Sequence, residues 1–155
     1  MIFVVHTTFS ILALLAGLIF LLPKGSKKHK KIGYIYSISM ILCVVTSFGL
    51  FNLWGSFGVY HVLSIVSFLT LVIALYFPLF GRKNKKWILQ HSIWMGYSYV
   101  GLVMAAGSHL FGVFPDWPNW LRIGLFWVFP YFTGSVLIFK NKDNRAEKAA
   151  KNIGK

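Results

Sequence analysis

Residues 24–54 read KGSKKHKKIGYIYSISMILCVVTSFGLFNLW, a cluster of lysines followed by an apolar run. The apolar part, Ile32–Trp54, is close to the ~20 residues that an α-helix needs to cross the hydrocarbon core of a bilayer. Lysines directly beside such a run are typical of the cytoplasmic end of a membrane span. The stretch therefore predicts a transmembrane helix that begins at the cytoplasmic face.

Similar apolar runs fill most of the remaining chain. Of the 155 residues, 57% are hydrophobic and only 12% are charged, whereas soluble proteins average roughly 25% charged residues. We therefore expect an all-α, polytopic membrane protein, with a transmembrane domain in residues 1–139 and a basic cytoplasmic tail in residues 140–155. The five predicted transmembrane helices are Ile2–Leu22, Ile32–Trp54, Val59–Phe80, Trp87–Leu110 and Trp120–Phe139.

The net charge of +13 is distributed unevenly along the chain. Lysine and arginine gather between the first two spans, between the third and fourth, and in the tail, while the connections Gly55–Gly58 and Phe111–Asn119 carry none. By the positive-inside rule, the N-terminus is outside and the tail is in the cytoplasm. No charge precedes Ile2–Leu22, which favours a retained helix over a signal peptide. The basic residues thus indicate topology in the cytoplasmic membrane, with the lipid bilayer as partner and no nucleic acid.

Four histidines occupy matching places in two successive pairs of spans. His6 opens the first span and His29 precedes the second; His61 opens the third and His91 begins the fourth. The pattern predicts a parallel two-helix repeat, related by an axis along the membrane normal, that forms a four-helix core with the fifth helix added. In such a core His6 faces His61 near the outer surface, and His29 faces His91 near the inner surface.

Pairs of histidines on facing helices are a common way to bind b-type haem. The preferred hypothesis is a di-haem electron carrier, which would act as a component of a membrane oxidoreductase, with haem b at His6/His61 and at His29/His91. Its redox partner would be a quinol or another carrier, and Arg122 is the outer candidate for the haem propionates. None of the five predicted spans contains Asp or Glu, which argues against proton-coupled transport by intramembrane carboxylates.

Two other interpretations stay open. His109 follows His91 by 18 residues, which is about five turns of one helix face. His6, His61 and His109 could then form an outer three-histidine site for a divalent metal. Alternatively the protein binds no cofactor and is a small transport or accessory subunit whose histidines are structural.

The chain also resembles an uncharacterised bacterial family of small predicted multi-pass membrane proteins. The likeness covers about residues 1–110 and rests on two segments, Lys24-Gly25-x3-His29-Lys30-Lys31-x-Gly33-x2-Tyr36 and His91-x2-Trp94-Met95-x2-Ser98-Tyr99. Tyr97 and His109 stand where that family usually has arginine. The resemblance implies histidines at patterned positions but no chemistry. The arrangement of histidines on two sides is similar to cytochromes b of the ascorbate-dependent transmembrane type, and that likeness implies two haems in a four-helix core.

Overall fold

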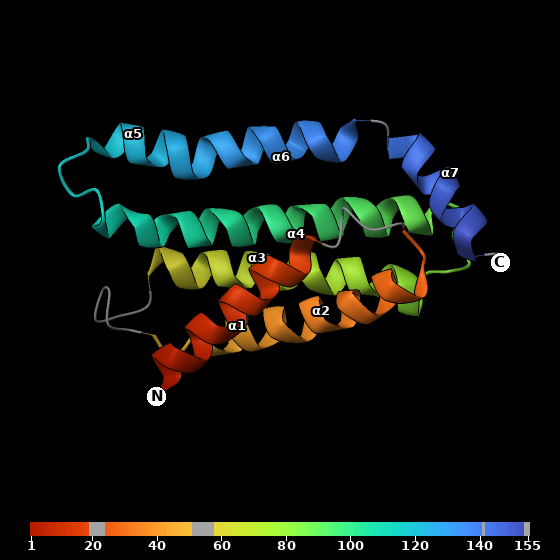
Figure 1. Cartoon of the computed structure of the whole chain (residues 1–155), viewed down its shortest axis with the longest axis horizontal. Helices are drawn as coiled ribbons and strands as arrows, with labels where there is room; N and C mark the ends of the chain where they lie inside the picture. The colour runs from red at the N-terminus through yellow and green to blue at the C-terminus, as the bar shows by residue number, and fades with distance from the viewer. Residues whose placement is uncertain (19–23, 51–57, 141, 154–155) are drawn as a thin grey trace.

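The computed structural model describes residues 1–18, 24–50, 58–140 and 142–153, and every regular element in these ranges is a helix. Figure 1 shows the long helices lying side by side as antiparallel hairpins. The elements are α1 (Ile2–Gly17), α2 (Lys27–Ser47), α3 (Val59–Leu79), α4 (Trp87–His109), η2 (Leu110–Gly112), α5 (Asn119–Ile123), η3 (Gly124–Val128), α6 (Phe129–Phe139) and α7 (Lys142–Ile153).

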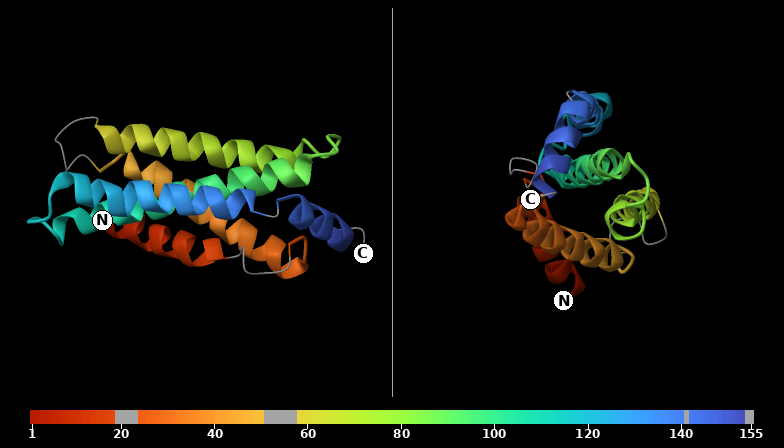
Figure 2. Two further views of the ribbon diagram at one scale, coloured as in Figure 1. Left: turned by 90° about the horizontal axis from the view of Figure 1, so that it is seen from above. Right: turned by 90° about the vertical axis from the view of Figure 1, so that its right-hand side faces the viewer.

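The first four long helices form a closed bundle. α1 packs against α2 and α3 against α4, while further contacts join α2 to α3 and α1 to α4. α1 and α3 begin at one end of the bundle, and α2 and α4 begin at the other (Figure 1). The end-on view in Figure 2 shows α6 stacked on α4, on the side away from α1 and α2.

In the four-helix bundle, α1, α2 and α3 each bury a narrow stripe and expose large apolar side chains elsewhere, as α2 illustrates. On its other faces Ile38 and Val45 are 57% and 58% exposed. Exposed apolar surface on this scale suits contact with lipid better than contact with water. The buried stripe of α2 follows helical spacing and includes Tyr36, Met40, Cys43 and Val44.

The last apolar segment is a nearly continuous helix with a π-helical turn at its centre. α5 runs into η3, a five-residue π-helix, and η3 runs into α6. The π turn ends two residues before Pro130, which has no N–H for the α-helical hydrogen-bond pattern. α6 lies close to α4 because a glycine stands at the contact: a Cβ at Gly134 would overlap the Val100 side chain.

Two helical segments among the described residues are both long and apolar enough to cross a membrane, Tyr60–Leu79 and Asn119–Phe139. α1 is apolar but shorter, and it ends at Gly17 rather than at the predicted Leu22; residues 19–23 lie outside the described part. α2 begins at Lys27, five residues before the predicted start of the second span, and ends at Ser47. The predicted end of that span, Trp54, falls outside the described residues.

The early start of α2 has a local cause. Ser26 is its N-cap, and the Ser26 hydroxyl accepts a hydrogen bond from the His29 backbone N–H at 3.1 Å. Such a cap satisfies one of the free N–H groups of the first turn. The lysine cluster is therefore largely helical rather than a loop before the helix.

Candidate functional site

The candidate site lies at the end of the bundle where α2 and α4 begin. His29 is in the first turn of α2, and its ring Nδ1 is buried without a hydrogen-bond partner among the described residues. The pKa of His29 is lowered from 6.5 to about 4, chiefly by burial and in addition by the nearby His91 and Lys24. His29 stands before the apolar run of the second span, and its imidazole is neutral at physiological pH.

His91 comes from the first two turns of α4 and is fixed by a neighbouring helix. Its Nδ1 lies 2.8 Å from the Ala74 carbonyl oxygen of α3. A carbonyl only accepts, so Nδ1 carries the proton and Nε2 keeps its lone pair. Beside His91, Lys24 donates from Nζ to the Ser92 hydroxyl at 2.9 Å. The structure thus brings His29, His91 and a lysine together, as the repeat predicts for the two histidines.

Two turns deeper along α2 and α4, a buried polar contact closes the space between them. The hydroxyl oxygens of Tyr36 and Ser98 lie 2.9 Å apart, and both residues are almost fully buried. The Tyr99 ring lies 6.4 Å from the Tyr36 ring, and the Tyr99 hydroxyl donates to the Leu14 carbonyl of α1 at 3.2 Å. A Cβ at Gly17 would overlap the Tyr99 ring, so this glycine makes room for the tyrosine.

His6 is buried near the opposite end of the bundle and is tied to α2. Its Nδ1 lies 3.0 Å from the Cys43 carbonyl oxygen and 3.1 Å from the Thr46 hydroxyl. Nδ1 therefore donates to the carbonyl, and Nε2 keeps its lone pair, as in His91. The two anchored imidazoles share one tautomer although they lie at different ends.

His61 has the other tautomer. Its Nδ1 accepts a hydrogen bond from the backbone N–H of Gly58, the N-cap of α3, at 3.1 Å. In a neutral ring that accepts at Nδ1, the proton resides on Nε2. His61 is 4% exposed, and its ring lies 6.1 Å from that of Phe48. In this arrangement the side chain caps its own helix rather than offering a lone pair at Nε2.

The three-histidine metal site is not assembled in the described part of the chain. No group of three or more His, Cys, Asp or Glu side chains there is placed to hold a metal ion. His6 and His61 are buried, whereas His109 is the exposed last residue of α4.

Arg122, the predicted outer anion ligand, binds its own connecting segment. It donates to the Phe111 carbonyl at 3.1 Å and to the Asn119 side-chain oxygen, and its guanidinium lies 5.6 Å from the centre of the Phe111 ring. These contacts fasten α5 to η2, the short helix that follows α4. Both Nη atoms of the guanidinium are therefore bonded within the protein, while its Nε is buried without a hydrogen-bond partner among the described residues.

Comparison with known proteins identifies a family. Residues 3–138 match the family DUF2306, described as a predicted membrane protein. The chain belongs to this family. Comparisons with the curated proteins and with the solved structures each found no match. DUF2306 membership establishes a membrane protein across most of the chain and specifies no activity.

Sequence reasoning overlooked the Tyr36–Ser98 contact in this DUF2306 protein. Tyr36 stands seven positions after His29, and Ser98 stands seven positions after His91. Seven residues are about two helical turns, so each pair shares one helix face. This shared spacing is the feature of the sequence that could have predicted the contact between Tyr36 and Ser98. Sequence reasoning also did not find the role of Gly96 in packing: a Cβ there would come within 2.7 Å of Ile138 on α6, outside the four-helix bundle.

Proposed function

We propose that the protein is a membrane electron carrier that binds b-type haem between histidine pairs, with His29 and His91 as the primary pair. The observation that carries the proposal is the meeting of two neutral imidazoles at one end of the bundle. His29 has a buried Nδ1 without a hydrogen-bond partner in the described residues. His91 has an unprotonated Nε2 held in place through Nδ1.

The anchoring of His91 is the kind that metal ligands need. Metal-binding histidines usually donate their second N–H to a carbonyl or carboxylate, which fixes the tautomer and makes the ligating nitrogen more basic. Ala74 provides that acceptor for His91, and Cys43 provides it for His6. When bound, haem supplies one-electron transfer at a potential set by its axial ligands and their surroundings.

Charge at this end of the bundle also favours the proposal. A haem carries two propionates, and Lys24 lies beside His91 through its bond to Ser92. The lysines of the first turn of α2 add positive charge. Of the three acidic residues of the chain, Asp143 and Glu147 are on α7 at this end, where Glu147 pairs with Lys151 at 2.9 Å. Lys24 would meet a propionate, while His29 and His91 ligate.

The Tyr36–Ser98 contact limits where a haem ring could lie. It closes α2 against α4 about 10 Å from the level of the histidines, at ~1.5 Å per residue. The ring would therefore lie on the basic side of this contact. Tyr36 and Ser98 would form the floor of the site and exclude water from it.

A second haem between His6 and His61 would require more rearrangement of the protein than the haem between His29 and His91. His6 has a suitable tautomer, but His61 would have to protonate Nδ1 and give up its bond from the Gly58 N–H before Nε2 could ligate. Arg122 would likewise have to leave Phe111 to reach a propionate. We therefore expect the inner site to bind haem more tightly than the outer one.

The proposed topology places five spans in the cytoplasmic membrane, with the N-terminus outside. The basic residues support it: the start of α2, the start of α4 and the whole of α7 lie at the same end of the bundle (Figure 1). A cytoplasmic location for this end follows from the positive-inside rule. Electrons would then pass between a quinol or other membrane reductant and an acceptor.

An absorption spectrum of the full chain, purified from cells supplied with haem, tests the function. We expect a Soret band and sharp α-bands on reduction, with loss of the tighter haem in His91→Ala and His29→Ala. His109→Ala is the matched control because His109 is exposed at the far end of α4. A protein free of haem under these conditions would overturn the proposal.

A second candidate is a non-redox membrane subunit with structural histidines. The contacts of His6 with Cys43 and of His61 with Gly58 favour it, because they satisfy one ring nitrogen of each residue within the protein. On this alternative, His6→Ala and His61→Ala lower the free energy of unfolding and no variant changes a visible spectrum. Absorption spectra and unfolding measurements on the same purified variants decide between the haem carrier and the non-redox subunit.

A further inference from the structure

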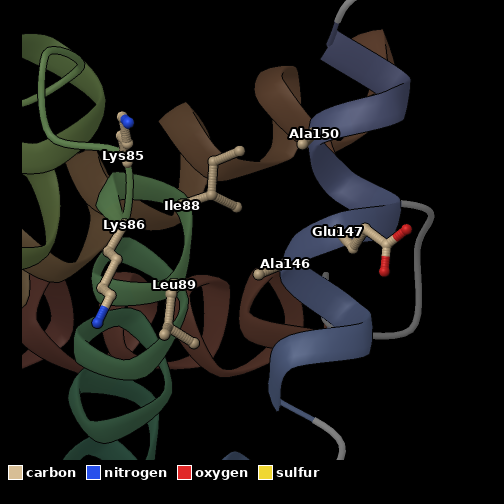
Figure 3. A pocket seen from close by; sticks show the side chains of 7 residues that line it. All are labelled: Lys85, Lys86, Ile88, Leu89, Ala146, Glu147 and Ala150. Atoms are coloured by element: carbon tan, nitrogen blue, oxygen red, sulfur yellow. The ribbon is translucent and has the colours of Figure 1, made fainter.

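A groove separates α7 from the start of α4, at the same end of the molecule as His29 and His91. Figure 3 shows Ala146 and Ala150 on α7 facing Ile88 and Leu89 on α4. The groove has a volume of about 280 Å³, and its walls are largely apolar. Because the two alanines are small and four residues apart, they leave a continuous furrow along one face of α7.

Positive charge lines the rim of this groove. Lys85 and Lys86 are exposed at its edge, and Figure 3 shows them on the α4 side with their amino groups directed away from α7. Glu147, the acidic residue of the lining, points away from them in the same view and forms an ion pair with Lys151 at 2.9 Å. The rim lysines are thus not neutralised by Glu147.

The groove stands where apolar helices give way to charged segments. α6 ends at Phe139, and Lys142 Nζ of α7 lies 5.5 Å from the Phe139 ring. On the other wall, the Arg82 guanidinium lies 5.9 Å from the ring of Trp87, the first residue of α4. Tryptophan at the end of a span is typical of the headgroup level of a membrane. Trp87 therefore indicates that the α4 wall of the groove lies at the headgroup level.

We propose that this groove binds one anionic phospholipid of the surrounding bilayer. Its phosphate would meet Lys85 and Lys86, and the first methylenes of an acyl chain would lie on Ile88, Leu89, Ala146 and Ala150. Basic pockets at the cytoplasmic face commonly bind acidic headgroups, and the apolar floor matches a lipid better than a soluble anion. The site is independent of haem.

Native mass spectrometry of the full chain, with phosphatidylglycerol or phosphatidylcholine added to detergent, tests the site. We expect wild-type protein to retain phosphatidylglycerol selectively, and the double variant Lys85→Gln/Lys86→Gln to lose about tenfold in retention. The matched control is Lys27→Gln/Lys28→Gln, two exposed lysines at the start of α2 at the same end of the bundle. Equal losses in the two double variants would overturn the proposal, because they would indicate general surface attraction.

Two further measurements test the apolar floor. Ala150→Leu fills the furrow without changing charge, and we expect it to reduce phosphatidylglycerol retention; an unchanged retention would contradict a lipid in the groove. Inorganic phosphate at millimolar concentration should not displace the lipid. Displacement would reassign the rim as a simple anion site. Circular dichroism of each variant verifies that the helices are intact.

Discussion

The hydroxyl oxygens of Tyr36 and Ser98 lie 2.9 Å apart in the buried centre of the bundle, and each residue follows a histidine by seven positions. The pair therefore joins the two histidine-bearing helices along the faces that carry His29 and His91. It couples the hairpin α1–α2 to the hairpin α3–α4. The inner histidine site depends on this coupling, because it fixes how close α2 and α4 come.

Removing the Tyr36 hydroxyl should weaken the bundle. Tyr36→Phe leaves Ser98 buried without this partner, and we expect a loss of about 1 kcal/mol in the free energy of unfolding in detergent. Tyr34→Phe is the control, because Tyr34 is 65% exposed on the same helix. In a double-mutant cycle with Ser98→Ala, a coupling energy near zero would contradict an energetically significant bond.

Gly17 should not tolerate even a methyl group. Since a Cβ there overlaps the Tyr99 ring, Gly17→Ala should lower the free energy of unfolding by about 1–3 kcal/mol. The same change at Gly124 meets nothing within 4 Å and should be neutral or slightly stabilising. Adding Tyr99→Ala to Gly17→Ala should make the glycine substitution less costly. Equal thermal stability of the Gly17→Ala and Gly124→Ala proteins would refute this packing.

The neutral state of His29 should make stability fall on acidification. Its pKa is about 4 in the folded protein, lowered from 6.5, so the unfolded chain binds more protons between these values. Stability that is complete above pH 6.5 is then lost progressively as the pH falls toward 4. His29→Gln removes this component. We expect the difference in unfolding free energy between wild type and variant to change with pH in that window and to be constant above it.

The N-cap of α2 should contribute measurably to the start of that helix. Ser26→Ala removes the acceptor for the His29 N–H and should cost about 1 kcal/mol. Ser26→Asp keeps an acceptor and adds a negative charge at the helix N-terminus, which is favourable there. We expect hydrogen exchange at residues 27–30 to speed up in Ser26→Ala and to remain slow in Ser26→Asp. Identical exchange in both variants would exclude a capping role.

The sequence predicts the helices and their order well, because the length of an apolar run and the lysines beside it are local properties of the chain. Matching histidines also predict that His29 and His91 lie at one end, as the structure places them. The tautomer of His61 could not be predicted, since it depends on how the Gly58 N–H points. The packing of Gly96 against Ile138 of α6 could not be predicted either, because the repeat carries no information on where the fifth helix docks. The contacts of Arg122 could not be predicted for a similar reason: its partners belong to a connection without a recognisable pattern. Its role toward a haem propionate stays a prediction.

The histidine anchors also determine the mechanics of the bundle. His6 fastens α1 to α2 at the end where α1 begins, and His91 fastens α4 to α3 at the end where α4 begins. The two hairpins are therefore braced at diagonally opposite corners. The His6 anchor therefore opposes separation of α1 from α2 at one end of the bundle. The His91 anchor opposes separation of α3 from α4 at the other end. Shear between the two hairpins is in turn opposed by the Tyr36–Ser98 contact, which joins α2 to α4.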